Sequence, residues 1–380
     1  MYRQVKQIAI DPVPIKEGSP MQNEYGDPDV VERLARGIRD SLLRPVRLME
    51  VCGTHTVSVF RHGIRSLLPP EITLVSGPGC PVCVTTQADL GAFMGLSAIP
   101  GAIAATFGDL LRVPGTQGSL MDARASGLDV RIVYSPSDAV TLARNNPDRP
   151  VVFFAVGFET TAPAVAAALK SARQSRIANF FIYPAMKLVP PALSALLGQN
   201  PSVDGLILPG HVCVILGTGP FHPLAQEFRL PMTVTGFEAA DILLGIRDLV
   251  AMISHQRFSV TNSYLRAVSD NGNPVARALM NEVFTPAPAR WRGLGEIPGS
   301  GLALHPEYSA FDAASAFHLR PGPEPDPGPC RCADILTARA TPPDCPLFAT
   351  ACTPAHPHGP CMVSSEGTCA AFFRYQQRKR

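Results

Sequence analysis

Short apolar runs rich in β-branched residues recur along the chain and alternate with longer segments of helical periodicity. Continuous apolar runs of this length are typical of strands buried on both faces of a parallel sheet. The helical segments between them supply crossover connections, so the pattern predicts an α/β fold with parallel sheets. We expect eight strands, at residues 46–51, 72–75, 102–107, 130–134, 151–156, 179–183, 205–208 and 232–235, and helices at residues 56–68, 86–96, 137–145, 162–173 and 239–254.

The predicted strands fall into two sets of four, separated by the turn-rich sequence NNPDRP at residues 145–150. We therefore expect an N-terminal extension at residues 1–26 and two similar α/β domains, at residues 27–147 and 148–255. A weak internal repeat agrees with two similar domains, because the tripeptide Gly-Phe-Glu follows a predicted strand at residue 157 and again at residue 236.

The alternation ends after residue 255, and residues 256–380 predict a helical and irregular region. Residues 271–284 are polar and compatible with a helix, whereas residues 286–305 are rich in Gly and Pro and predict irregular structure. The sequence PGPEPDPGP at residues 321–329 predicts a stiff, extended connector. This connector leads into a cysteine-rich tail.

The composition is that of a large globular protein and not of a nucleic-acid-binding or membrane protein. With 380 residues, 46% apolar and 17% charged positions, the chain is long enough for two or three cores. A net charge of +2 argues against nucleic-acid binding. The apolar runs are much shorter than the roughly 18 to 20 residues that span a bilayer. Residues 1–20 mix charges and prolines and lack the apolar segment of a signal peptide, so we expect a cytoplasmic protein without a membrane anchor.

The chain has ten cysteines, and six of them lie in the tail. Thiols this dense indicate metal ligation or disulfides, and in the cytoplasm they stay reduced or bind metal. Their spacing matches neither the ferredoxin run nor the paired Cys-x2-Cys of zinc ribbons. It suits an iron–sulfur cluster held by a folded tail. The six are Cys330, Cys332, Cys345, Cys352, Cys361 and Cys369.

The first predicted strand runs directly into Cys52-Gly53-Thr54-His55. In open parallel sheets, functional loops gather beyond the carboxyl ends of the strands. A helix that follows Cys52 would favour the thiolate through its dipole, and the thiolate is the form that binds metals. The alternative is a buried structural cysteine, which Gly53, His55 and the next motif make less favoured.

The second predicted strand runs into the sequence GPGCPVC, which places Cys80 and Cys83 in a Cys-x2-Cys turn. This spacing serves redox-active dithiols, zinc sites and inert turns. With Cys52 and His55 it would complete a Cys3His zinc set. Closed zinc sites usually stabilise small domains that lack a core, so we favour the redox dithiol.

Further strand-end loops add polar groups. Residues 157–161 (GFETT) offer the carboxylate of Glu159, and residues 209–213 (PGHVC) offer the imidazole of His211. A structural histidine is the alternative for His211. Cys213 lies among aliphatic residues and is expected to fill the core.

Taken together, CGTH (residues 52–55), GPGCPVC (77–83), GFETTAP (157–163), CPLF (345–348) and CMVSSEGTCAA (361–371) resemble the HypD family of [NiFe]-hydrogenase maturation proteins. The resemblance spans nearly the whole chain, from about residue 27 to residue 375. It implies two similar α/β domains plus a [4Fe-4S] region. It also implies a cytoplasmic scaffold on which an Fe(CN)2CO unit is assembled with the small chaperone HypC, with cyanide from HypE, before delivery to the hydrogenase large subunit.

The resemblance also implies roles for individual residues. Cys52 would hold the iron, with His55 beside it, and Cys80 and Cys83 would form a redox-active pair near that site. Glu159 and His211 complete the candidate catalytic set. The family's cluster pattern falls on Cys330, Cys345, Cys352 and Cys369, which leaves Cys332 and Cys361 as a second dithiol; Cys330 and Cys332 could exchange roles.

A second class of function is a [4Fe-4S]-dependent protein disulfide reductase, similar in logic to ferredoxin:thioredoxin reductases. The Cys-x2-His of residues 52–55 discriminates between the two, because a reductase needs no such motif beyond its dithiol. The sequence assigns no catalytic turnover, no electron donor, no source of carbon monoxide and no particular hydrogenase.

Overall fold

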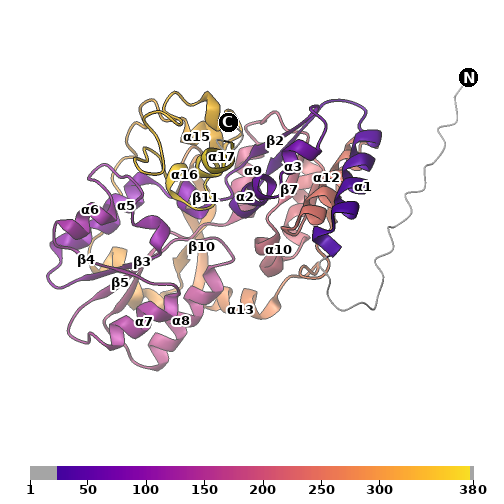
Figure 1. Ribbon diagram of the computed structural model, residues 1–380. Coiled ribbons are helices and arrows are strands. Elements are labelled where there is room, and N and C mark those ends of the chain that lie inside the picture. Colours follow the sequence, from indigo (N-terminus) through magenta and orange to yellow (C-terminus); the bar gives the residue numbers. More distant parts are fainter. Residues whose placement is uncertain (1–23, 377–380) are drawn as a thin grey trace, which may run out of the picture.

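The computed structural model describes residues 24–376 of the chain (Figure 1). Residues 1–23 of the predicted N-terminal extension lie outside the described part, and its end, Glu24–Gly26, forms the short 3-10 helix η1. The rest of the chain contains two parallel sheets with helices packed on them, so the predicted α/β class is confirmed.

Sheet A contains β1 (Val46–Glu50), β2 (Ile72–Ser76), β7 (Gly205–Leu208), β8 (Met232–Val234) and β9 (Val260–Asn262), and its helices include α1 (Pro28–Ser41), α2 (Gly53–Arg61), α3 (Ile64–Leu67) and α12 (Ala239–Ser254). The strand order is β2-β1-β7-β8-β9, and all neighbours are parallel. Leu34 and Ile38 of α1 and Ile242 of α12 share a buried cluster with Leu48 and Ile207 of the strands. Burial on this face explains why the strands are continuous apolar runs.

Sheet B contains β3 (Ile103–Thr106), β4 (Asp129–Ile132), β5 (Val151–Ala155) and β6 (Phe180–Pro184), with α7 (Pro136–Arg144) and α8 (Ala162–Gln174) packed on it. The strand order is β4-β3-β5-β6, again parallel throughout. Ile103 and Phe153 of the sheet share a core with Val165 and Leu169 of α8. The two sheets form separate lobes in Figure 1.

All eight predicted strands are present, but their division at residues 145–150 is wrong. The chain leaves sheet A after β2, builds all of sheet B, and returns to sheet A with β7, which pairs with β1. The predicted domains, residues 27–147 and 148–255, therefore each contain strands of both sheets. The reason is that the apolar pattern identifies strands but carries no information about their partners. The two Gly-Phe-Glu tripeptides do fall one in each sheet, after β5 and after β8.

The prediction of irregular structure at residues 286–305 is also wrong. This segment forms most of an antiparallel hairpin of β10 (Phe284–Trp291) and β11 (Gly295–Leu304). A bulge between Ala287 and Ala289 accommodates Pro288, which cannot donate to a ladder, whereas Pro286 stays in register opposite Leu302. Trp291 is buried, and its indole N–H donates to Ser300 Oγ at 2.9 Å. The hairpin therefore has its own packed anchor.

The remaining elements connect the lobes and build the tail. They are α4 (Pro81–Val84), α5 (Gln87–Met94), η2 (Gly95–Ala98), η3 (Gly108–Leu110), α6 (Leu120–Ala125), α9 (Val189–Leu197), α10 (Gly210–Leu216), η4 (Gly219–Phe221), α11 (His222–Glu227), α13 (Pro274–Val283), η5 (Pro306–Phe311), α14 (Ala313–Ala316), α15 (Cys332–Leu336), η6 (Pro342–Asp344), α16 (Pro360–Val363) and α17 (Thr368–Gln376).

The cysteine-rich tail contacts both lobes, above the gap between them in Figure 1. On the sheet A side, Phe372 of α17 packs edge-on against Phe60 of α2, with ring centroids 4.7 Å apart. On the sheet B side, Asp109, which follows β3, accepts hydrogen bonds from the hydroxyls of Ser364 and Ser365. The tail thus lies over the ends of strands from both sheets.

Candidate functional site

Cys52 lies at the carboxyl end of β1 and caps the N-terminus of α2, so the helix starts at Gly53, three residues earlier than predicted. The next loop of the sheet packs directly against it, because Gly53 N–H donates to Gly79 O at 3.0 Å. A Cβ on Gly79 would lie only 2.2 Å from Cys52 N. Only glycine at this position lets the two motifs meet.

Cys80 and Cys83 are joined by a disulfide. Pro81 opens the short helix α4, and Cys83 N–H points back at Cys80 Sγ at 3.2 Å. The alternative Cys3His zinc set is not assembled: within residues 24–376, no three His, Cys, Asp or Glu side chains converge on a single-ion site.

His55 is completely buried on α2. Its Nε2 lies 2.9 Å from Gly236 O and 2.9 Å from Thr235 Oγ1, both at the end of β8. Burial lowers the pKa of His55 to about 4, so the ring is neutral near pH 7. Its Nδ1 is buried and has no hydrogen-bond partner in the described part of the chain.

The ring of Phe237 lies between two imidazoles. It stacks on His55 at 4.5 Å between centroids and on His211 at 4.2 Å. His211, at the start of α10, is exposed, and desolvation by the neighbouring groups lowers its pKa. The structure therefore brings His211 into the same site as His55, at adjoining strand ends of sheet A.

Burial opposes the thiolate expected at Cys52. Burial raises the pKa of the Cys52 thiol to about 11, which outweighs hydrogen bonds from the start of α2 that lower it, and the negative charge of Glu366 adds to the rise. A neutral thiol is the resting form, and binding of a cation is what would displace its proton.

Glu366 was not predicted as a site residue. Its Oε1 accepts a hydrogen bond of 2.6 Å from Thr54 Oγ1, inside the CGTH motif. The contact is tight, because a Cβ on Gly53 would lie 2.6 Å from Glu366 O. Glu366 belongs to the SSEG sequence of the tail. Its place in that motif was the only sequence feature that could have marked it as a site residue.

Glu159 follows β5 of sheet B and is 1% exposed. Its Oε1 accepts from Val189 N–H at 2.9 Å, whereas its Oε2 is buried with no partner among residues 24–376. Burial raises the pKa of Glu159 to about 7. Cys213 is buried in the core, as predicted. Burial raises the pKa of its thiol, and negative charge on Glu159 or Cys52 would raise it further. Glu159 is therefore linked electrostatically to the Cys52 site through Cys213.

The six tail cysteines line one common cavity. Burial raises the pKa values of the Cys330 and Cys352 thiols, and the neighbouring cysteines add to the rise. Thiols gathered in this way are the donor set that an iron–sulfur cluster takes.

The other two tail thiols form a close pair. Cys332 Sγ lies 2.7 Å from Cys361 Sγ, and both side chains are buried. Cys361 also interacts with Cys369, so the pair adjoins the other four cysteines, and the division into four and two that the resemblance implies stays a prediction.

The chain is similar to known proteins over nearly its whole length. Residues 29–376 match the family model described as "HypD: Hydrogenase formation hypA family". The chain is 42% identical to the hydrogenase maturation factor HypD of Escherichia coli K12 over 368 residues, which cover 94% of this chain and 98% of that protein. It is also 40% identical to HypD of Cupriavidus necator (94% and 97% covered) and 42% identical to HypD of Rhodobacter capsulatus (93% and 97% covered). No helix within residues 24–376 is long and apolar enough to cross a membrane.

Proposed function

This chain belongs to the HypD family of hydrogenase maturation proteins, and we propose that it is the scaffold on which the Fe(CN)2CO unit of a [NiFe]-hydrogenase is assembled. One observation carries the proposal: Cys52 lies where the CGTH loop, the Cys80–Cys83 loop and the tail meet, beside the buried His55. A disulfide reductase has no need of this additional buried thiol and imidazole.

In this proposal the iron is the cargo, and Cys52 is its protein ligand. A soft thiolate suits an iron that carries cyanide and carbonyl ligands. The buried position of Cys52 (7% exposed) and His55 (0%) excludes bulk water from the site. Neutral His55 is held at Nε2 by the end of β8, and its Nδ1 is left to accept or donate a hydrogen bond to a bound group.

We propose that Cys330, Cys345, Cys352 and Cys369 hold a [4Fe-4S] cluster, which supplies one-electron chemistry when bound. Their arrangement around one cavity supports this assignment. Cys332 and Cys361 would then act as a second dithiol, and Cys80 and Cys83 as a redox pair beside Cys52 that cycles between disulfide and dithiol. Thiol trapping in defined redox buffers tests that pair, since a two-electron transition should disappear in Cys80→Ser.

The partners follow from the same proposal. A HypC-type chaperone would share the iron with Cys52, a HypE-type protein would supply cyanide, and the finished unit would pass to the hydrogenase large subunit. We place these steps in the cytoplasm, where thiols stay reduced. Glu159 and His211 are proposed as accessory groups around the site.

The test is the infrared spectrum of anaerobically purified protein. Cyanide and carbonyl stretches should be present in the wild type and absent from Cys52→Ala, together with loss of the complex with the small chaperone. The brown colour of the tail cluster should persist, because the two sites use separate ligands. A Cys52→Ala protein that retains both bands and still matures hydrogenase would refute the proposal.

A further inference from the structure

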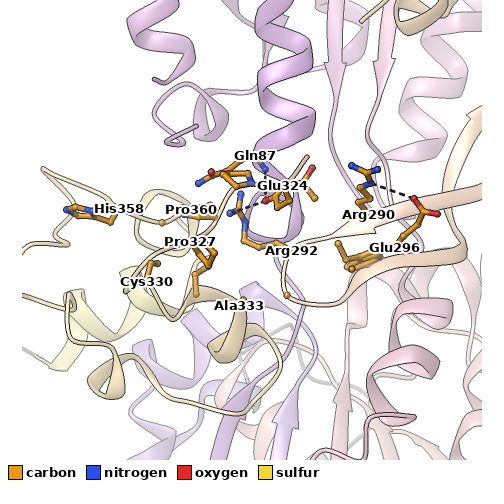
Figure 2. Close-up of a pocket in the computed structure, with 17 residues that line it drawn as sticks. Gln87, Arg290, Arg292, Glu296, Glu324, Pro327, Cys330, Ala333, His358 and Pro360 are labelled. Atoms are coloured by element: carbon orange, nitrogen blue, oxygen red, sulfur yellow. Dashed lines mark hydrogen bonds and ion pairs between the residues drawn. The ribbon is translucent and has the colours of Figure 1, made fainter. Parts of the chain in front are cut away.

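A cavity of about 470 Å³ opens beside the tail, away from Cys52. Its walls come from the turn of the β10–β11 hairpin, from the N-terminus of α5, from the proline-rich connector and from the tail (Figure 2). This volume lies within the range of about 300–1,000 Å³ that is typical of small-molecule sites. The proposed scaffold function assigns roles to Cys330 and Cys332 in its wall but no ligand to the cavity itself.

The two sulfurs of the tail dithiol differ in their access to this cavity. Cys332 lines it, and it also lines the inner cavity that all six tail cysteines share. Cys361, whose Sγ is 2.7 Å from that of Cys332, lines the inner cavity only. Of these two sulfurs, a molecule in the outer cavity therefore meets that of Cys332, with Cys361 behind it. Cys330, which is assigned to the cluster, lines the same cavity.

The charged groups of the outer cavity come in two pairs of opposite sign. Arg290 lies 3.6 Å from Glu296, and Arg292 lies 3.7 Å from Glu324 (Figure 2). Both separations exceed those of close charge-assisted hydrogen bonds, about 2.7–2.9 Å. Glu324 also accepts from the N–H groups of Gln87 and Ala88, and Arg292 donates to two backbone carbonyls, so the partly exposed Arg290 and Glu296 are the pair left for a ligand. Guanidinium groups bind carboxylates and carboxylates bind ammonium groups, so this lining complements a small zwitterion.

We propose that the cavity binds a low-molecular-mass thiol that carries carboxylate and ammonium groups, and that this thiol exchanges with the tail dithiol at Cys332. The inference rests on the proposed redox role of the tail and is independent of the iron unit at Cys52.

The exchange balances without any further reactant. When the pair is oxidised, the ligand thiolate attacks Cys332 Sγ, the Cys332–Cys361 bond breaks, and Cys361 leaves with the electron pair and takes up a proton. A second ligand thiolate then attacks the ligand sulfur of the mixed disulfide and releases Cys332. The small thiol becomes a disulfide, and the protein gains two thiols. Cys361, the leaving sulfur, faces the cavity assigned to the cluster.

The decisive experiment follows the reverse reaction in full-length protein. Cys361→Ser and Cys332→Ser are reduced anaerobically and exposed to oxidised glutathione, and the mixed disulfides are located by peptide mass spectrometry. We expect glutathione on Cys332 in Cys361→Ser to form roughly tenfold faster than glutathione on Cys361 in Cys332→Ser, because Cys332 lines the outer cavity and Cys361 does not. Equal rates, or a faster reaction at Cys361, would overturn the proposal.

A second arm keeps both thiols. In Gly359→Ala, the added Cβ would lie 3.9 Å from Cys332 Sγ and 3.0 Å from Cys330 Sγ, whereas Gly322→Ala, the control, meets nothing within 4 Å. We expect glutathione exchange to slow several-fold in Gly359→Ala alone, with cluster absorbance recorded to detect loss of the metal site. An unchanged rate in Gly359→Ala contradicts access through this cavity.

The ligand class is tested with Arg290→Gln. Its exchange with glutathione should slow, while its exchange with the uncharged disulfide of 2-mercaptoethanol should match the wild type. Equal effects on the two probes would overturn the zwitterion assignment. None of these measurements uses the cyanide and carbonyl bands, so failure here and failure of the scaffold proposal are distinguishable.

Discussion

Burial sets the charge of the individual residues around Cys52. The Cys52 thiol, the His55 imidazole and the Glu159 carboxyl are all shifted toward their neutral forms, and desolvation is the largest cause for each of them. A site that starts neutral avoids the cost of buried, unpaired charge. It can then accept a metal cation in exchange for a proton.

His55 gives a pH dependence of stability with a definite sign. Its pKa falls from an ordinary value of 6.5 to about 4 in the folded protein. Between these values the unfolded chain binds a proton that the folded chain does not, so the free energy of unfolding falls as the pH drops from 6.5 to 4, by up to about 3 kcal/mol. Denaturant titrations should show a smaller loss over this range in His55→Gln. A loss of the same size in the variant would contradict the assignment.

Glu159 should show the opposite dependence. Its folded pKa, about 7, lies above the ordinary value of 4.5, so its contribution to stability is greatest below pH 4.5 and is lost as the pH rises through 7. Glu159→Gln removes the buried negative charge. We therefore compare the free energy of unfolding of the variant with that of the wild type. The difference should shift in favour of the variant by about 2–3 kcal/mol between pH 4.5 and pH 8. Urea unfolding at the two pH values measures this, and a difference independent of pH would be evidence against it.

The sequence identified the residues of this site that follow apolar strands. Cys52 and His55 stand directly after a continuous apolar run and next to a glycine, which is a local signal. Glu366 has no such signal, because its partner Thr54 is 312 positions away in the chain. The neutrality of Cys52 was also missed, since burial depends on packing by the tail and the neighbouring loop.

At the scale of elements, the β10–β11 hairpin holds the Cys80–Cys83 loop in place. Arg292 at its turn donates from Nε to Cys83 O at 3.1 Å and from a terminal nitrogen to Thr85 O at 2.8 Å, and its backbone N–H donates to Val84 O at 3.0 Å. These carbonyls belong to the end of α4 and would otherwise be unsatisfied. The hairpin thus serves as a cap for the helix that carries Cys83.

Arg292→Gln should therefore destabilise the protein by about 2–4 kcal/mol, because two hydrogen bonds from a charged donor to buried carbonyls are lost. The matched control is Arg290→Gln on the same hairpin, whose side chain is 46% exposed and should change stability by less than about 1 kcal/mol. Urea unfolding of the two variants gives the comparison. Similar losses in both would mean that the cap has no special role.

Helices and strands with strong local patterns were predicted well, as α12 at residues 239–254 illustrates. The hairpin was missed because its prolines and glycines resemble loop sequence. Its stability comes from the bulge and from buried Trp291, which are features of packing and not of periodicity. The strand β9 is only three residues long, too short for a periodic signal.

At the scale of the whole molecule, the tail joins the two lobes. It contacts sheet A through Glu366 on Thr54, and the sheet B lobe through Ser364 and Ser365 on Asp109. The strand order, in which the chain leaves sheet A and returns to it, ties the lobes together a second time. Neither link could be read from local sequence, because each joins segments far apart in the chain.

Removal of the sheet B link should loosen the tail selectively. Asp109 Oδ2 accepts from Ser364 Oγ, from Ser365 Oγ and from Ser365 N–H, at 3.0–3.1 Å. Loss of these bonds to a partly exposed carboxylate in Asp109→Ala should cost about 1–2 kcal/mol of local stability, so tail amides should exchange with solvent roughly tenfold faster.

Hydrogen exchange of residues 361–371 measures this effect, with Asp40→Ala, at an exposed position on α1, as the control. In Asp109→Ala, faster exchange should be confined to the tail and the adjoining CGTH loop, while the strands of sheet A keep their protection. Because the tail supplies the carboxylate at Thr54, the same variant should also weaken retention of iron at Cys52. Unchanged exchange in the tail, or uniform loss of protection across both sheets, would show that Asp109 does not hold the tail over the site.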